Sequence, residues 1–224
     1  MQRRIRHVSA LEGYQRWAAT YDATPNPVVA MDRRFTPAFL RLEPGERILD
    51  AGCGTGASLP SFVAGGARPV GIDFSVEMLK LAHRRQPGVH LAAADLQRPL
   101  PLRPRRFDAA LCALVGEHLD DLPAVFTELR RVLRPQGRLV FSVYHPELAA
   151  AGVEANFEAA DTEYRLGAVR YSTADYLTLL SDAGFHNLAA QDFAGDETLA
   201  SAIPNGARYL GRPMLLVLTA RNAV

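Results

Sequence analysis

The stretch Ile48-Leu49-Asp50-Ala51-Gly52-Cys53-Gly54-Thr55-Gly56 joins an apolar run to a loop of three glycines, with an acid at the junction. Glycine permits a positive φ and lets a ligand approach the backbone more closely than a Cβ would allow. Residues 57–64 can then begin a helix whose first amides face the ligand. The stretch therefore predicts a strand, a loop and a helix that together hold a nucleotide cofactor.

Asp50 favours one class of cofactor over another. A carboxylate just before the first glycine would repel a pyrophosphate, but it can accept hydrogen bonds from an ammonium group. This favours a cofactor with an amino-acid end, such as S-adenosylmethionine. The spacing Gly52-x-Gly54-x-x-Ala57 also satisfies the dinucleotide fingerprint, so an NAD-dependent oxidoreductase is the first alternative.

A second acid, Asp73, ends the next apolar run, Pro69-Val70-Gly71-Ile72-Asp73. It follows the loop by about 20 residues, the spacing at which a carboxylate meets the hydroxyl groups of a ribose. Asp73 fits both cofactors. The alternative is a surface-loop acid without a ligand.

Five blocks stand in the order and at the spacing of a known family: ILDAGCGTG (48–56), GIDFSVEML (71–79), AAADLQRPLPL (92–102), FDAALCALVGEHLDDL (107–122) and ELRRVLRPQGRLVFSVYHP (128–146). From about Trp17 to Tyr144 the chain resembles the class I S-adenosylmethionine-dependent methyltransferases. Within them it is similar to the methyltransferase type 11 group, which includes ubiquinone, menaquinone and many natural-product methyltransferases. The resemblance implies an enzyme that uses S-adenosylmethionine and releases S-adenosylhomocysteine. It fades beyond Tyr144, in the region that usually selects the substrate.

The order of apolar runs predicts an α/β fold. Helices are expected at 10–20, 28–41, 57–64, 76–85, 122–133 and 174–183. Strands are expected at 47–50, 69–73, 89–93, 107–113 and 138–144, with an antiparallel pair at 186–193 and 213–220. With the resemblance, this implies a Rossmann-like sheet of seven strands, mostly parallel with the last strand antiparallel, and helices on both faces. We expect one domain over 1–224, divided into a helical lid (1–44), a cofactor-binding core (45–144), a substrate-cover insertion (145–172) and the C-terminal part of the sheet (173–224).

The resemblance also implies contacts to an adenine ring. Asp95 would accept a hydrogen bond from the adenine amino group while Leu96 packs beside the ring. Phe74 and Met78 would lie against the other face. The alternatives are a helix-cap or turn acid for Asp95 and ordinary core packing for Phe74 and Met78.

Residues of the opening helix and of the segment after the fourth strand complete the expected site. Tyr14 and Tyr21 lie seven residues apart on one helical face, so they can shield the sulfonium and reach the methionine carboxylate of the cofactor. We expect Tyr21 to contact the cofactor and Tyr14 to contact the substrate. The alternative is that Trp17 and Tyr21 pack the helix down. In this family Leu114 would line the adenine or methyl channel. Glu117 and His118 would lie at the border between cofactor and substrate, although His118 can also be an exposed residue at a helix start.

Methyl transfer requires little acid–base machinery, because positioning and exclusion of water supply most of the rate. A hydroxyl nucleophile still benefits from a general base, and His145, after the fifth strand, is the catalytic candidate. Its alternative role is to cap the strand before a proline turn. Tyr144 is a weaker candidate and is expected to contact the substrate. Aromatic residues among acids in 147–172 indicate a small organic substrate with some polarity.

Composition excludes several classes of partner. The net charge of +1 gives no electrostatic reason to expect nucleic acid. After the fourth strand, DNA amino-methylating enzymes carry an Asn or Asp followed by Pro-Pro and an aromatic residue. This chain lacks that motif. The sequence contains no run of 18 apolar residues, so we expect no membrane span. Cys53 and Cys112 stand in apolar surroundings without metal-ligand spacing, so we expect a reducing, cytoplasmic location and no metal.

The sequence thus predicts an S-adenosylmethionine-dependent methyltransferase that acts on an oxygen or nitrogen of a small molecule, of unspecified oligomeric state. The oxidoreductase alternative is disfavoured by Asp50 and Asp95. It is also disfavoured by the absence of a Tyr-x-x-x-Lys pair, since Lys80 is the only lysine and the residue four positions before it is Val76. A cofactor-binding module without catalysis is the other alternative, because methyl transfer has no obligatory catalytic residue.

Overall fold

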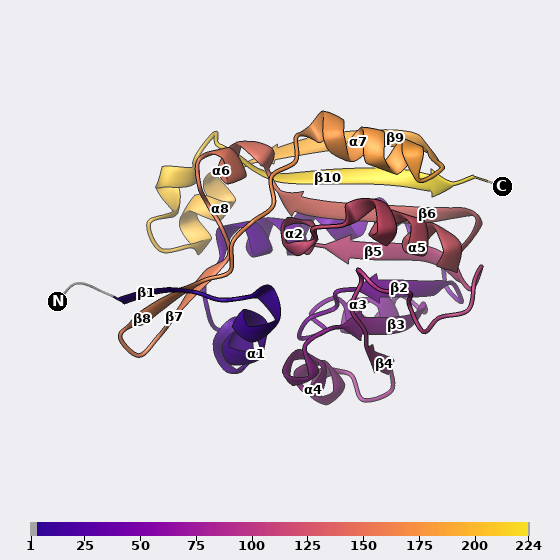
Figure 1. Ribbon diagram of the computed structural model, residues 1–224, viewed down its shortest axis with the longest axis horizontal. Coiled ribbons are helices and arrows are strands. Elements are labelled where there is room, and N and C mark those ends of the chain that lie inside the picture. The colour runs from indigo at the N-terminus through magenta and orange to yellow at the C-terminus, as the bar shows by residue number, and fades with distance from the viewer. Residues whose placement is uncertain (1–3, 224) are drawn as a thin grey trace.

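The computed structural model describes residues 4–223 and contains a seven-stranded sheet with helices on both faces (Figure 1). The strand order is β4-β3-β2-β5-β6-β10-β9, in which β10 runs antiparallel to both of its neighbours and the other neighbouring pairs are parallel. The strands are β2 (Arg47–Ala51), β3 (Arg68–Asp73), β4 (His90–Ala93), β5 (Phe107–Ala113), β6 (Leu133–Tyr144), β9 (Phe185–Ala194) and β10 (Pro213–Asn222). This confirms the predicted α/β sheet. Residues 1–3 of the predicted lid and Val224 of the predicted C-terminal part lie outside the described residues.

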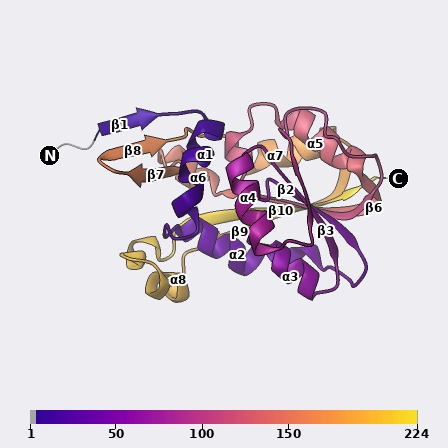
Figure 2. The same ribbon diagram turned by 90° about the horizontal axis from the view of Figure 1, so that it is seen from below.

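Helices cover both faces of the sheet, and their apolar sides form two cores. Figure 2 shows α5 and α7 on one side of the sheet and α2 and α3 on the other. The helices are α2 (Pro27–Leu40), α3 (Leu59–Ala64) and α4 (Val76–Arg85) on one face, and α5 (Leu122–Val132) and α7 (Thr173–Asp182) on the other. Side chains of β6 alternate between these cores, because Leu139 and Phe141 join the α5–α7 side and Val140 joins the α2–α3 side.

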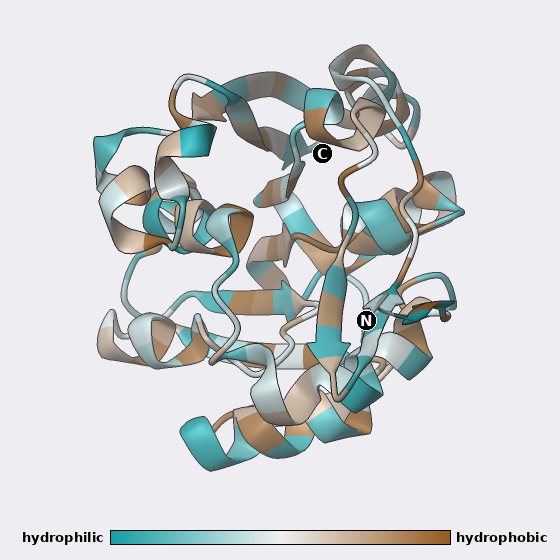
Figure 3. Cartoon of the chain, turned by 90° about the vertical axis from the view of Figure 1, so that its left-hand side faces the viewer, coloured by the Kyte–Doolittle hydropathy of each residue, from teal (hydrophilic) through white to brown (hydrophobic). Residues whose placement is uncertain are grey.

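The central strands carry long apolar runs because both of their faces are buried. In β5, Phe107 and the residues from Ala109 to Cys112 are all buried, as expected for a parallel strand between two helical layers. The helices instead alternate between hydrophobic and hydrophilic residues along their length (Figure 3). This pattern gives each helix one face toward the sheet and one toward solvent.

Two of the predicted boundaries that differ from the structure have a clear physical reason. The helix expected from Ala57 begins at Leu59, because the residues from Gly52 to Ser58 form turns around glycines with positive φ. The strand expected from Arg138 begins at Leu133, since Leu133 already pairs with Phe107 of β5.

A second, three-stranded sheet lies beside α1 at one end of the molecule (Figure 1). Its order is β1-β8-β7, with β1 (Arg4–His7) parallel to β8 (Thr162–Arg165) and β7 (Asn156–Ala159) antiparallel to β8. All four residues of β1 are exposed, so no apolar alternation marks this strand in the sequence. The remaining elements are α1 (Ala10–Tyr21), α6 (Pro146–Ala150), α8 (Glu197–Ala202) and the 3₁₀ helices η1 (Gly116–His118) and η2 (Gly206–Tyr209).

The two predicted lid helices differ in what they cover. α2 packs on the main sheet, where Val28, Met31 and Leu40 belong to its core. α1 instead packs against the insertion, and the Trp17 and Phe157 rings stack with their centroids 5.1 Å apart. None of the helices within residues 4–223 is long and apolar enough to cross a membrane.

Candidate active site

The glycine loop between β2 and α3 is held tightly against β3. The backbone N–H groups of Gly52 and Cys53 both donate to the Ile72 carbonyl, at 2.8 and 2.9 Å. Gly52 has a φ of +81°, and a Cβ there would lie 2.4 Å from a Val115 methyl group. Gly54, at φ +51°, has no atom within 4 Å of the position of a Cβ. At Gly52 a side chain would collide with Val115. At Gly54 a side chain would instead occupy open space beside the loop.

Asp73, at the end of β3, holds this loop in place through hydrogen bonds. Its carboxylate oxygens accept hydrogen bonds from the Gly54 N–H at 2.9 Å and the Ser75 N–H at 2.8 Å. Burial raises the pKa of Asp73, while these two amides act in the opposite direction. Each carboxylate oxygen can accept a further hydrogen bond. Asp73 can therefore hold the loop and still receive two hydroxyl groups of a ribose.

A cavity of about 330 Å³ opens beside the loop at the carboxyl ends of the strands. This volume falls in the range of small-molecule sites. Eleven of the predicted site residues line it: Tyr14, Tyr21, Gly52, Gly54, Asp73, Phe74, Met78, Asp95, Leu96, Leu114 and His118. Residues predicted from five separate sequence segments thus surround one cavity, which we call the cofactor cavity.

Asp50 does not line the cofactor cavity but lies buried at the end of β2, 4% exposed. Burial, with the nearby charges of Asp73 and Asp32, raises its pKa to about 7. No hydrogen bond to its carboxylate is formed within residues 4–223. An ammonium group bound at the loop would offset the cost of burying the Asp50 carboxylate. The sequence predicts such an ammonium group as the ligand of Asp50.

The four residues predicted to contact adenine all line the cofactor cavity. Asp95 accepts a hydrogen bond from the Gln97 N–H at 2.9 Å, so it also forms a turn, and Leu96 beside it is buried. Met78 is buried on α4, and Phe74 lies 6.2 Å from the Tyr14 ring, measured between centroids. An apolar slot with one carboxylate at its edge suits an aromatic ring with an amino group.

Leu114 adopts a left-handed backbone conformation with φ +53° where β5 ends at the cavity. Its N–H donates to the Ser142 carbonyl at 2.8 Å, which holds the turn in place. Non-glycine residues in this region of φ are strained, and such strain gathers at functional sites. The sequence predicted Leu114 as a site residue but gave no sign of this conformation.

The helix α1 closes one side of the cofactor cavity. Its Tyr14 and Tyr21 rings lie 6.0 Å apart, and the Tyr14 hydroxyl forms a 3.0 Å hydrogen bond with Nε2 of His118. Burial lowers the pKa of His118 to about 4, so the ring is neutral at pH 7. Its Nδ1 is buried without a hydrogen-bond partner among the described residues. This nitrogen is available to a bound molecule.

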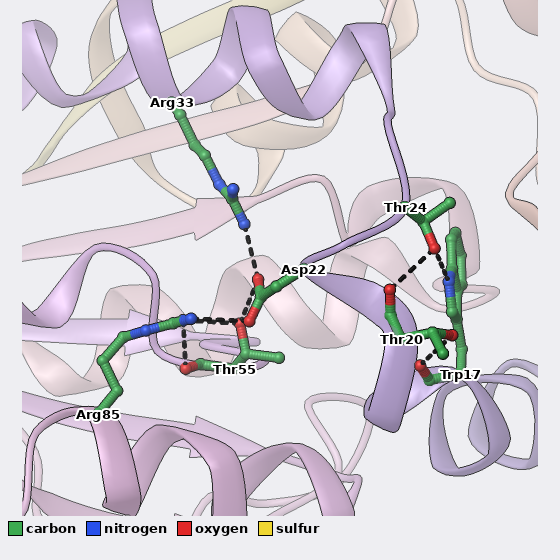
Figure 4. A network of polar contacts seen from close by, with 7 residues as sticks. All are labelled: Trp17, Thr20, Asp22, Thr24, Arg33, Thr55 and Arg85. Carbon is green, nitrogen blue, oxygen red and sulfur yellow. Dashed lines mark hydrogen bonds and ion pairs between the residues drawn. The ribbon is translucent and has the colours of Figure 1, made fainter.

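Asp22, just after α1, connects the lid to the glycine loop and to two helices (Figure 4). Its carboxylate accepts hydrogen bonds from Thr55 of the loop at 3.0 Å, Arg85 of α4 at 2.7 Å and Arg33 of α2 at 3.0 Å. Partial burial acts to raise the pKa of Asp22, but these hydrogen bonds outweigh it and lower the pKa below its ordinary value. The network fixes the end of α1 to the glycine loop. The sequence does not predict this link, because Thr55 and Arg85 lie 33 and 63 residues after Asp22 in the chain.

Glu117 on η1 faces a cavity of only about 10 Å³ behind the lid. Burial, aided by the charge of Asp32, raises the pKa of Glu117 to about 7. Its Oε2 is buried and has no hydrogen-bond partner within the described residues. We call this space the connecting cavity, because it shares Tyr14, Tyr21 and Leu114 with the cofactor cavity.

A larger second cavity, of about 550 Å³, lies on the other side of the connecting cavity. It is bounded by the insertion, and it shares Trp17, Asn26 and Tyr144 with the connecting cavity. The Asn26 side-chain amide donates to the Tyr144 hydroxyl at 2.9 Å. Asn26 was not predicted as a site residue. In the structure its Oδ1 also caps α2, where it accepts hydrogen bonds from the N–H groups of Val28 and Val29.

His145 lies outside all three of these cavities. Its Nδ1 accepts a hydrogen bond from the Glu147 N–H at 3.2 Å, which caps α6, and its Nε2 lies 3.2 Å from Asp192 Oδ1. Both ring nitrogens are therefore engaged. This geometry favours the alternative in which His145 caps the turn after β6.

Residues 4–223 contain no group of three or more His, Cys, Asp or Glu side chains placed to hold a metal ion. Both cysteines are buried, and burial raises their pKa values above the usual range.

Comparison with known proteins gives matches that are described as methyltransferases. A family model described as a methyltransferase domain matches residues 49–141. A malonyl-[acyl-carrier protein] O-methyltransferase of Pseudescherichia vulneris is 32% identical over 198 residues, 84% of this chain and 74% of that protein. A demethylmenaquinone methyltransferase of Streptomyces griseus is 32% identical over 157 residues, 68% of this chain and 65% of that protein.

Among solved structures, an S-adenosylmethionine-dependent methyltransferase from Mesorhizobium loti aligns with a TM-score of 0.73 and 26% identity, over 88% of this chain and 100% of that one. The chain spans 50% to 65% of the length of four of the curated relatives that it matches.

Proposed function

The chain belongs to the class I S-adenosylmethionine-dependent methyltransferases, and from this membership we propose that it transfers a methyl group to a nucleophilic oxygen or nitrogen of a small molecule. The observation that carries the proposal is the sequence of three adjoining cavities. The cofactor cavity, which contains the carboxylate of Asp73, shares lining residues with the connecting cavity. The connecting cavity in turn shares lining residues with the second cavity.

The residues of the cofactor cavity fit S-adenosylmethionine. Asp73 retains acceptor capacity for ribose hydroxyls, and Gly54 leaves open space at the cavity wall. Asp50 has no cationic partner among the described residues. When bound, the cofactor supplies a methyl group on a sulfonium, which is already activated toward displacement. The protein then needs to orient a nucleophile and exclude water. α1, tied down through Tyr14 and Asp22, provides that closure.

The second cavity is the proposed substrate site. It lies under the insertion at 145–172, with Trp17, Tyr144 and Phe157 in its wall. Its mixture of aromatic and polar residues suits an organic molecule with polar groups. The names of the two relatives above refer to different substrates, so the acceptor of this chain has to be argued from its own residues.

Cofactor selectivity tests the first half of this proposal. Calorimetry on the purified protein should show that S-adenosylmethionine and S-adenosylhomocysteine bind at one site per chain and that NAD does not, because Asp50 disfavours a pyrophosphate at the loop. Tighter binding of NAD than of S-adenosylhomocysteine would contradict it and restore the oxidoreductase alternative.

A further inference from the structure

Glu117 is a buried carboxylate beside the cofactor cavity that lacks an ionic partner. It is 5% exposed, and none of the ion pairs formed within residues 4–223 includes it. Its Oε2 also lacks a hydrogen-bond donor there. The carboxylate of Asp32, which has the same sign, acts to raise the pKa of Glu117 further. A buried carboxylate is costly unless it is paired, so this site is built for a partner that is not part of the chain.

The surroundings of Glu117 define what that partner can be. The connecting cavity has room for about one water-sized group. Its wall contains the aromatic side chains Tyr14, Trp17, Tyr21 and Tyr144. Aromatic rings attract cations, most strongly where water is excluded. A carboxylate among several aromatic residues is therefore a site for a small cationic group.

Building on the proposed function, we propose that the connecting cavity binds the ammonium group of an amine substrate and that Glu117 accepts a proton from it. A hydroxyl group would supply a hydrogen bond to Oε2 but would leave the negative charge without a counterion. An ammonium group supplies both. Asn26 and Tyr144 line both the connecting cavity and the second cavity, so the proposal places the rest of the amine in the second cavity.

The proton transfer that this requires is balanced between two groups. The N–H bond of the ammonium breaks, its electron pair stays on nitrogen as the lone pair, and the proton goes to Oε2 of Glu117. The products are a neutral amine, which is nucleophilic, and a neutral carboxylic acid. Burial favours the neutral form of Glu117, which lowers the cost of the transfer.

Binding to the complex with S-adenosylhomocysteine tests this inference without turnover. The probes are benzylamine and 2-phenylethylamine, each compared with the alcohol of the same skeleton by calorimetry at pH 7. We expect the amines to bind at least about tenfold more tightly than the alcohols, since a desolvated ion pair is worth more than one neutral hydrogen bond. Glu117→Gln should remove this preference while changing the affinity for S-adenosylhomocysteine by less than about threefold.

Glu197→Gln on α8 is the matched control, because Glu197 is exposed and lines none of the three cavities. It should keep the preference for amines. The comparison of amines with alcohols uses the wild-type protein, so it stands even if the Glu117 variant fails to fold.

The inference is overturned if the wild-type complex shows no preference for the amines. Failure of the wild-type complex to bind any of the four probes would also overturn it. It is also overturned if Glu117→Gln keeps the preference, or if it weakens S-adenosylhomocysteine as much as the amines, which would assign Glu117 to the cofactor. Failure of the proposed function itself would look different, because S-adenosylhomocysteine would not bind to the wild-type protein.

Discussion

Replacing Gly54 by leucine is expected to abolish binding of S-adenosylmethionine. A Cβ at this position meets no atom within 4 Å, and Gly54 lines the cofactor cavity, so a leucine side chain would fill cavity space without colliding with the protein. A non-glycine residue at a φ of +51° adds strain of about 1–2 kcal/mol, which the fold should tolerate. Calorimetry should detect no binding, or affinity reduced by at least about a hundredfold.

Gly45→Leu separates blocking from strain. Gly45 also has a positive φ, +87°, and open space around its Cβ position, but it lies before β2 and does not line the cavity. Both variants should show a similar decrease in melting temperature, while the Gly45 variant keeps its affinity. Normal cofactor binding by a folded Gly54→Leu protein would mean that the cofactor lies elsewhere.

Asp73→Asn should weaken binding of S-adenosylmethionine by at least about tenfold. Each charge-assisted hydrogen bond to a ribose hydroxyl is worth ~1.5–3 kcal/mol, and an amide nitrogen cannot accept one. The variant also loses an acceptor for one of the two backbone amides that Asp73 holds, from Gly54 or Ser75. Both effects act in the same direction, because the second loosens the loop that carries Gly54. The measurement is calorimetry with S-adenosylhomocysteine, with circular dichroism to verify the fold.

Asp108→Asn is the control for the loss of a backbone acceptor. Asp108 accepts the Arg47 N–H at 2.8 Å and does not line the cofactor cavity. It should leave affinity unchanged. Equal affinity of the wild-type and Asp73→Asn proteins would reduce Asp73 to a structural acid of the loop.

Part of the cofactor cavity can be predicted from the sequence because several of its residues directly follow strands of the parallel sheet. Asp73 follows the apolar run of β3, and Asp95 follows β4. Carboxyl ends of neighbouring parallel strands meet at one edge of the sheet, so local patterns along the chain place these acids together in space. No knowledge of the surrounding side chains is needed for that step.

The connecting cavity could not be predicted in the same way. Asn26, Glu117 and Tyr144 come from three distant segments, and only their packing shows that Oε2 of Glu117 has no partner. The same holds for His145, whose position after β6 suits a base until its two engaged nitrogens are seen. β1 was missed for another reason, since it pairs with the insertion through its backbone while its side chains stay exposed.

The central claim is that this chain transfers a methyl group to a small molecule, and formation of S-adenosylhomocysteine during incubation with S-adenosylmethionine tests it most directly. The substrate panel should contain small amines, alcohols, phenols and carboxylic acids, with a blank that lacks any acceptor. We predict S-adenosylhomocysteine above the blank for at least one class, with amines giving the highest rate, and loss of the signal in Gly54→Leu. Tight binding of S-adenosylmethionine without product above the blank for any class would contradict the claim and identify the chain as a cofactor-binding module without catalysis.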